Sequence, residues 1–306
     1  MTKKLLLLFF LLNSFSPLFP QSSHLKVISY NIWNGFDWGK DKDREQAMVA
    51  WLKNEDADVI GFQELNDFTQ EKLEQLASQW GHPHAILLKE DGYPIGITSK
   101  TPLQLQARML GGLWHGMLHV RTAGIDFLVV HLSPHDWRFR RREAEMITSY
   151  MENALVKTGK SAFMVLGDFN AHSPFDAQLD RLNPHALENN RQADSLRYVE
   201  KGEGAYQTLR DGQFDYSVMA RFLSLPLIDV VEKHMEVEKR HSFPTPVVID
   251  KSEAGKKQHG RIDYILVSPV LENRCIDAKV INSGEPEHLS DHYPVVAEFK
   301  WENTHP

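Results

Sequence analysis

The sequence predicts a mixed α/β fold in a single domain, and three patterns support this. Residues 25–80 alternate short apolar runs with amphipathic segments, which indicates a strand, helix, strand, helix unit. Residues 84–132 hold several short apolar runs separated by Asp-Gly, Gly-Gly and Ala-Gly pairs, which is typical of antiparallel strands. Polar side chains repeatedly follow directly after an apolar run. No internal repeat, low-complexity tract or linker divides the chain, so one domain is the simplest organisation.

The first unit contains two strands and two helices. Residues 25–32 alternate two apolar sets, which predicts a strand buried on both faces. A helix over 43–54 carries its apolar residues at helical spacing, and a short apolar strand over 57–62 runs directly into Gln63 and Glu64. The second helix has one apolar stripe within residues 73–80.

The remaining elements follow the same two periodicities. Short strands are expected over 84–88, 94–99, 113–121, 125–132, 162–166, 261–267 and from 293 onward. A helix is expected over 138–157, with several arginines in its first turn. Residues 171–260 are polar apart from one apolar run over 222–231, so we expect loops and short helices there, at the rim of a substrate site.

The N-terminal segment has the pattern of a secretory signal peptide. Lys3 and Lys4 precede an apolar run over 5–12, and a segment rich in small residues and proline follows. This run is too short to span a bilayer as a helix. We therefore expect residues 1–22 to be removed and residues 23–306 to form the catalytic domain of an exported protein, either periplasmic or secreted. No second segment is apolar enough to be transmembrane, and nothing in the sequence requires a protein partner.

The expected mature chain is acidic. Removal of residues 1–20 takes away two lysines and no acids, which leaves 32 basic against 41 acidic residues and a net charge of −9. Tight non-specific binding to a polyanion needs clustered Lys and Arg, so this balance argues modestly against it. The single cysteine, Cys275, cannot form an internal disulfide, and we expect an inert buried thiol.

Polar residues at the expected strand ends form a candidate catalytic set. Its members are Asn31, Glu64, His131, Asp168, Asn170, Asp263, Asp291 and His292. Carboxylate and amide oxygens without a usable thiolate suit a hard cation such as Mg²⁺, with Mn²⁺ as the alternative, better than structural zinc. Hydrolysis of a phosphoester needs such a cation, a base that activates water and donors for the developing charge, and the set has a candidate for each task.

The motifs around these residues resemble those of a known family. They are Ser29-Tyr30-Asn31, Gly61-Phe62-Gln63-Glu64, Val130-His131-Leu132, Gly167-Asp168-Phe169-Asn170, Arg261-Ile262-Asp263-Tyr264 and Ser290-Asp291-His292-Tyr293-Pro294. In this order they resemble the motif series of the endonuclease/exonuclease/phosphatase superfamily, which includes deoxyribonuclease I, apurinic endonucleases, neutral sphingomyelinases and inositol polyphosphate 5-phosphatases. The resemblance extends from Lys26 to Phe299.

This resemblance implies a four-layer αββα sandwich, two mostly antiparallel sheets flanked by helices, with the site at one mouth of the sandwich. It implies that the magnesium ligands are Glu64, Asn31 and Asp291. Asp168 would orient or deprotonate the attacking water, and Asn170 and His131 would contact the phosphoryl group. His292, oriented by Asp263, would act as general base or acid. The choice between Asp168 and His292 as the base stays open.

Some features leave the subfamily open. Val130 stands where the nuclease and sphingomyelinase branches often have Thr or Asn, and we expect a partner for His131 among residues 90–93. His82 with His84 and His115 with His119 have ligand-like spacings, but chance spacing is the stronger explanation than zinc.

The sequence favours an exported phosphodiesterase or phosphatase acting on a small or lipid-linked ester. A secreted nuclease of the deoxyribonuclease I type is the alternative. Its basic groove would come from the arginines within residues 138–142 and from Lys256, Lys257, His259 and Arg261, and Trp137 and Phe139 flank Arg138. A non-catalytic binding protein on the same fold is a remote alternative, because no member of the candidate set is missing. A different reaction on the same scaffold also stays open.

Overall fold

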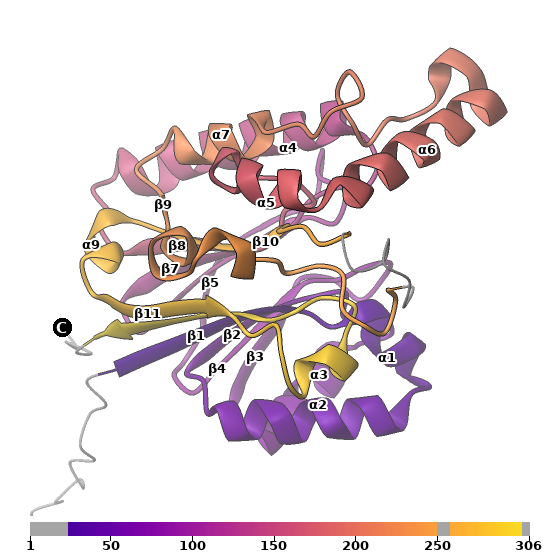
Figure 1. Ribbon diagram of the computed structural model, residues 1–306. Coiled ribbons are helices and arrows are strands. Elements are labelled where there is room, and N and C mark those ends of the chain that lie inside the picture. Colours follow the sequence, from indigo (N-terminus) through magenta and orange to yellow (C-terminus); the bar gives the residue numbers. More distant parts are fainter. Residues whose placement is uncertain (1–23, 250–257, 302–306) are drawn as a thin grey trace, which may run out of the picture.

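The computed structural model describes residues 24–249 and 258–301, so the expected signal peptide lies outside the described residues. Two sheets lie face to face between two layers of helices, as Figure 1 shows. This is the four-layer αββα sandwich, and the predicted fold class is confirmed.

The first sheet has the strand order β11-β12-β1-β2-β4-β3. Its strands are β1 (His24–Asn31), β2 (Val59–Gln63), β3 (His84–Leu87), β4 (Gly96–Ser99), β11 (Cys275–Val280) and β12 (Val295–Lys300). Only the β1–β2 pair is parallel, and β12 runs antiparallel to β1 with Ser29 opposite Val295. The carboxyl ends of β1 and β2 and the start of β12 therefore lie at the same edge.

The second sheet has the order β5-β6-β7-β8-β10-β9. Its strands are β5 (Gln104–Met109), β6 (Met117–Thr122), β7 (Ile125–His131), β8 (Phe163–Asp168), β9 (Ile228–Asp229) and β10 (Asp263–Val267). The β7–β8 pair is parallel, and β10 runs antiparallel to β8. The strands expected over 84–99 and over 113–132 thus form antiparallel pairs, but the two pairs belong to different sheets.

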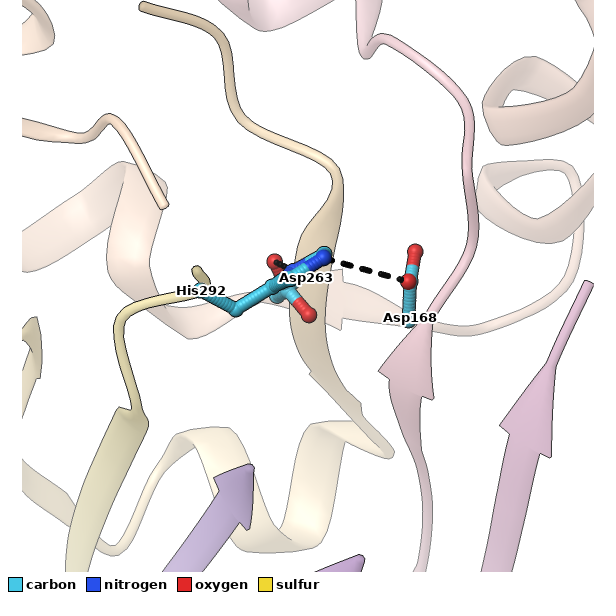
Figure 2. A group of neighbouring side chains, drawn as sticks. All are labelled: Asp168, Asp263 and His292. Carbon is cyan, nitrogen blue, oxygen red and sulfur yellow. Dashed lines mark hydrogen bonds and ion pairs between the residues drawn. The ribbon is translucent and has the colours of Figure 1, made fainter. Parts of the chain in front are cut away.

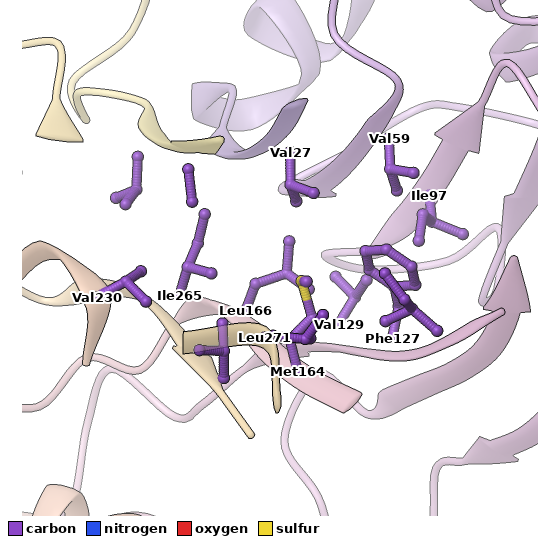
Figure 3. Close-up of a cluster of buried hydrophobic side chains, with 14 of the residues drawn as sticks. Val27, Val59, Ile97, Phe127, Val129, Met164, Leu166, Val230, Ile265 and Leu271 are labelled. Atoms are coloured by element: carbon purple, nitrogen blue, oxygen red, sulfur yellow. The ribbon is translucent and has the colours of Figure 1, made fainter. Parts of the chain in front are cut away.

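The core lies between the sheets and on both of their outer faces. Val27, Val129 and Leu166 belong to the apolar cluster between the sheets, which Figure 3 shows. Ile28, next to Val27 in sequence, lies in a second cluster on the outer face of the first sheet. Because successive side chains of a strand point to opposite faces, β1 is buried on both sides, as its sequence predicts.

Helices cover the outer faces of the sheets. α2 (Lys42–Glu55) and α3 (Gln70–Gln79) pack on the first sheet, and α4 (Trp137–Met151) and α7 (Ser217–Leu223) pack on the second. α2 begins at Asp41, whose side chain accepts a hydrogen bond from the Arg44 amide at 3.1 Å. A π-helical turn over Glu152–Val156 extends α4, so the helix expected over 138–157 is confirmed with a change of pitch near its end.

The shorter helices lie mostly in the connections. They are α1 (Trp33–Gly39), α5 (Ala177–Leu182), α8 (Val230–His234), α9 (Pro269–Glu272) and α10 (Pro286–Leu289). The expectation of only loops and short helices over 171–260 is wrong at α6 (Pro184–Lys201), an 18-residue helix. α6 has no buried residue and projects from the body in Figure 1, so it lacks the apolar stripe that reveals a helix in a sequence.

Three strands, β5, β9 and β11, were not expected from the sequence. All three lie at sheet edges, where backbone pairing to one neighbour holds them. Several side chains of β5 and β11 are exposed. Cys275 in β11 is half-buried, and burial raises the pKa of its thiol to about 11, which agrees with an inert cysteine. Within residues 24–249 and 258–301, no helix is both long and apolar enough to cross a membrane.

Candidate active site

The candidate residues meet at one mouth of the sandwich because of the strand directions. Asn31 ends β1 opposite Gln63 at the end of β2, and Glu64 follows. In the second sheet His131 ends β7 opposite Asp168 at the end of β8, and Asp168 is also opposite Asp263 at the start of β10. The register thus places strand-end residues of both sheets at the same edge.

Asp168 lies at the centre of this group. Its Oδ2 accepts a hydrogen bond from Nδ2 of Asn31 at 3.1 Å, which joins the two sheets. The same oxygen lies 3.5 Å from Nε2 of His131 and 3.8 Å from Nε2 of His292, while Oδ1 accepts from the Asn170 amide at 2.8 Å. Gly167 allows this position, because a Cβ there would lie 1.9 Å from the Val130 carbonyl oxygen. Donors from both sheets therefore surround one carboxylate.

Asp263 and His292 form a buried dyad. Oδ2 of Asp263 lies 2.9 Å from Nδ1 of His292 and accepts a hydrogen bond from the Ser242 hydroxyl at 2.7 Å. The other ring nitrogen of His292 then faces Asp168, as Figure 2 shows. A carboxylate on Nδ1 fixes the tautomer and orientation of an imidazole, which leaves Nε2 as the ring atom able to exchange a proton.

The charges of this group are strongly coupled. Burial lowers the pKa of His292, but Asp263, Asp291 and Asp168 together raise it well above its ordinary value. Burial and the nearby Asp263 raise the pKa of Asp168 to about 8, although His292 lowers it. The raised pKa values of a carboxylate and an imidazole that face each other suit proton transfer to and from water.

Glu64, Asn31 and Asp291 offer an oxygen-rich cation site. Oε1 of Glu64 accepts a hydrogen bond from Nδ2 of Asn31 at 3.2 Å, and Oε2 accepts from the Asn34 amide at 2.8 Å. Burial and the charge of Asp291 raise the pKa of Glu64, and burial raises that of Asp291. A divalent cation would relieve this repulsion, so the donor set fits magnesium.

A left-handed turn holds the loop beside Glu64. Residues 33–38 all have φ between 51° and 62°, and Gly35 lies so close to the backbone of Asn66 that a Cβ would be 2.0 Å from its carbonyl oxygen. Arg44 fixes the loop by donating to the carbonyl oxygens of Ile32, Trp33 and Leu289 at 2.8–3.1 Å. This strained backbone points the Asn34 amide at the carboxylate.

A second group could also hold a cation. Ligand atoms of Asp168, Asp263 and His292 lie within 4.8 Å of one another. A cation there would have to break the hydrogen bond between Asp263 and His292, and Oδ2 of Asp263 also accepts from Ser242. The oxygen-rich set therefore fits a divalent cation better than this group does, and the dyad can keep its hydrogen bond for proton transfer.

His131 has an unexpected neighbour. Its ring stacks on His115 with centroids 4.0 Å apart, and Tyr93 contacts His115 edge-on at 5.4 Å. Tyr93, within the region 90–93 where a partner for His131 was expected, thus contacts His115 instead. In the sequence His115 had only a chance ligand spacing with His119. Burial, His115 and His292 lower the pKa of His131 well below its ordinary value. Its Nδ1 is buried without a hydrogen-bond partner among the described residues, whereas its Nε2 faces Oδ2 of Asp168.

Glu143 positions the loops that carry these histidines, and no sequence pattern marks it. Its carboxylate accepts hydrogen bonds from the amides of Trp114 at 2.7 Å and Ser133 at 2.8 Å. Burial raises the pKa of Glu143 to about 7. Ser290 has a similar role, because its hydroxyl donates to the carbonyl oxygen of Asn31 at 2.7 Å and accepts from the His292 amide at 3.2 Å.

Other candidates from the sequence have structural roles. His82 is bound to Thr98 and the Ala57 carbonyl oxygen, and His119 to Tyr150 and Asp126. These contacts account for both histidines without zinc.

The basic residues considered for a nucleic-acid groove are largely occupied by other contacts. Arg261 is fully buried against Asp176 and Asp229, and the buried Arg140 donates to the carbonyl oxygens of Ser133 and Thr208. Arg138 pairs with Asp136, and Arg141 pairs with Glu145. Lys256 and Lys257 lie outside the described residues.

The comparison with protein families decides the identity of the chain. The sequence model of the Endonuclease/Exonuclease/phosphatase family matches residues 28–292. The chain belongs to this family. Members of the endonuclease/exonuclease/phosphatase family hydrolyse phosphoester bonds, and the match spans every candidate residue described above.

Solved structures of the endonuclease/exonuclease/phosphatase family share the fold. An AP endonuclease from Archaeoglobus fulgidus superposes with a TM-score of 0.65 at 20% identity, covering 90% of this chain and 99% of that one. A 3′-5′ exonuclease from Neisseria meningitidis superposes with a TM-score of 0.64 at 21% identity, covering 90% of this chain and 100% of that one. A 3′ phosphatase from Neisseria, bound to a product DNA hairpin, superposes with a TM-score of 0.63 at 21% identity, covering 90% of this chain and 100% of that one. A comparison with curated proteins finds no significant match in sequence.

Proposed function

We propose that this chain is an exported, magnesium-dependent phosphoesterase that hydrolyses a small or lipid-linked phosphoester. The observation that carries the proposal is the position of Asp168, which faces Asn31, His131 and His292 beside the acids Glu64 and Asp291. This arrangement combines a proton acceptor, donors for a phosphoryl group and an oxygen-rich cation site within one buried mouth.

Each residue has a task in the proposed reaction. Glu64, Asp291 and Asn31 hold the cation, which neutralises charge on the phosphoryl oxygens when bound.

Asp168 orients the attacking water, and the Asp263–His292 dyad exchanges the proton at Nε2 of His292. His131 offers its Nε2, which lies 3.5 Å from Oδ2 of Asp168, to the phosphoryl group. Asn170 also contacts the phosphoryl group in this proposal. Its Nδ2 group donates to the Leu132 carbonyl oxygen at 3.0 Å, which holds the side-chain amide beside Asp168.

Replacement of Glu64 by glutamine tests the metal assignment. We expect hydrolysis of bis-p-nitrophenyl phosphate by the wild type to be lost with chelator and restored by Mg²⁺. Glu64→Gln should need at least about tenfold more Mg²⁺ for half-maximal rate, because one anionic oxygen ligand is lost. The magnesium titration should be run with Glu71→Gln, an exposed change on α3, as the control. An unchanged magnesium requirement in Glu64→Gln would remove Glu64 from the ligand set.

A secreted nuclease is the second candidate, since the solved structures named above include an AP endonuclease and a 3′-5′ exonuclease. Against it, Arg140 and Arg261 are buried in internal contacts and are not available to phosphates. Assays with p-nitrophenylphosphorylcholine, inositol phosphates and plasmid DNA separate the two candidates. Metal-dependent turnover of a small ester with intact plasmid supports the first, and chelator-sensitive plasmid cleavage supports the nuclease.

Export is proposed from the sequence of residues 1–22, with residues 23–306 as the catalytic domain. Expression of the full-length gene in a bacterial host should give a periplasmic or extracellular protein whose N-terminus lies near residue 23. N-terminal sequencing of the purified protein measures this directly. A chain that retains Lys3 and Lys4 and stays in the cytosol would contradict export.

A further inference from the structure

A cavity of about 180 Å³ opens beside the candidate active site. Asn170 and Phe243 line it, and the Phe243 ring lies 4.8 Å from the ring of His292. The other wall comes from the polar region after β8 and includes His172, Thr208, Phe214 and Asp215. A group esterified to a phosphate at Asp168 and Asn170 would therefore extend directly into this cavity.

His172 is held rigidly in the cavity wall. Its Nδ1 lies 2.7 Å from Oδ1 of Asp180, and the hydroxyl of Tyr216 donates to the other oxygen of Asp180 at 2.9 Å. The imidazole stacks on Phe214 with ring centroids 3.7 Å apart, and a Cβ on Gly260 would lie 3.0 Å from its Cε1. Nε2 of His172 is hydrogen-bonded to no residue that the structure describes. A fixed imidazole with one free nitrogen is therefore a built recognition group.

The charges of the cavity restrict what can enter it. Arg140 and Asp215 both line the wall, so a buried guanidinium and a buried carboxylate are present together. The carboxylate disfavours a second phosphate, and the guanidinium disfavours a quaternary ammonium group. Asp215, Thr208 and His172 can hydrogen-bond to hydroxyl groups, while Phe214 and Phe243 cover an apolar ring face.

The size of the cavity restricts the occupant further. Pockets for drug-sized ligands measure about 300–1,000 Å³, so 180 Å³ suits a single ring. We propose that this cavity is the subsite for the alcohol part of the substrate, that this alcohol is a neutral polyol of one sugar or cyclitol ring, and that His172 is the residue that recognises its hydroxyl groups. The inference rests on the proposed phosphoesterase function and gives it a substrate class.

Diesters that share one chromophore test this inference. The probes are p-nitrophenyl esters of inositol phosphate, of methyl phosphate and of thymidine 5′-phosphate, because each releases p-nitrophenolate by the same bond cleavage. For the wild type with Mg²⁺ we expect kcat/KM for the inositol diester to exceed that for the methyl diester by at least about tenfold, the value of one or two hydrogen bonds. His172→Ala should remove this preference and leave the methyl diester unchanged.

Matched variants separate recognition from a structural role. His172→Gln places an amide near the position of Nε2 and should restore part of the preference, whereas His172→Asn places it near Nδ1 and should not. Asp180→Asn should weaken the preference through KM for the inositol diester alone, because Asp180 acts by positioning His172. His288→Ala, a change at an exposed histidine, is the control.

The outcomes are distinguishable. A wild type inactive with Mg²⁺ on all three diesters and on the monoester p-nitrophenyl phosphate contradicts the proposed function itself. An active wild type whose polyol preference survives in folded His172→Ala and His172→Asn overturns the role of His172. A preference for the thymidine diester over the inositol diester overturns the polyol assignment and identifies the cavity as a nucleoside subsite.

Discussion

Asp168→Asn is expected to lower kcat for phosphodiester hydrolysis by about 10²–10⁴-fold, the usual contribution of a positioned acid or base. The asparagine keeps an oxygen that can accept from the Asn170 amide, which lies 2.8 Å from Oδ1 in the wild type. It loses the carboxylate that faces Asn31, His131 and His292. The loss should appear in kcat rather than KM, because the interaction with the reacting water is strongest in the transition state.

The same variant should be more stable than the wild type, and the gain should depend on pH. The ordinary pKa of an aspartate is 3.8, and burial with the nearby Asp263 raises that of Asp168 to about 8. Between these values the folded protein binds more protons than the unfolded chain, so wild-type stability falls as the pH rises through this window. Asparagine does not titrate. In chelator, the free energy of unfolding of Asp168→Asn should therefore be higher than that of the wild type by about 1–3 kcal/mol at pH 8. The difference should be small at pH 5.

Urea unfolding at the two pH values measures this difference. Asp211→Asn, a change at a side chain that is 94% exposed, is the control and should be neutral at both. A variant that is less stable than the wild type at pH 8 would show that the Asp168 carboxylate is stabilised when charged. A double variant with His292→Ala separates the two candidate bases: if both act in one proton transfer, the double variant loses little more than either single variant.

The strand-end residues were predictable because their pattern is local. Asn31, Glu64, His131 and Asp168 each end or directly follow an apolar strand, and parallel pairs bring such ends to one edge. Local patterns were not enough to predict the contact between Asp263 and His292, because the two residues are far apart in sequence and belong to different sheets. Only the ordered motifs, through their resemblance to the family, suggested that the two residues meet.

The residues that support the site were not predictable, because they act through long-range contacts. His115 stacks on His131 from another strand connection, and Glu143 joins two loops from within a helix. His172 acquires its partner Asp180 only when the chain after β8 folds back as α5. α6 escaped prediction for a different reason, since it buries no residue and so carries no apolar stripe. Local patterns thus reveal the elements and the reacting groups, whereas packing determines their partners.

Arg261→Met is expected to lower the free energy of unfolding by about 3–5 kcal/mol, because it leaves the buried Asp229 without its cation and the buried Asp176 with only Arg240 at 3.6 Å. The guanidinium donates to Asp176 at 2.7 Å, forms two hydrogen bonds with Asp229 and stacks on Tyr264 with 4.5 Å to the ring centroid. Asp176 precedes α5 and Asp229 caps α8, so this ion pair fastens the region after β8 to the start of β10. Asp263, two residues after Arg261, is the first residue of β10. The position of the Asp263–His292 dyad therefore depends on how firmly the start of β10 is held.

Urea unfolding of Arg261→Met should be compared with Arg181→Met, a change at an exposed arginine of α5 that should alter stability by no more than about 0.5 kcal/mol. The triple variant with Asp176→Asn and Asp229→Asn should recover much of the loss, because removing all the buried charges removes the desolvation cost of the unpaired acids. A loss below about 1 kcal/mol in Arg261→Met would mean that water or Arg240, 3.6 Å from Asp176, replaces the guanidinium. The triple variant could recover stability in part without recovering turnover. That result would show that the ion pair also positions Asp263 against His292. Neutral side chains can fill the space, but they cannot fix the start of β10 as tightly.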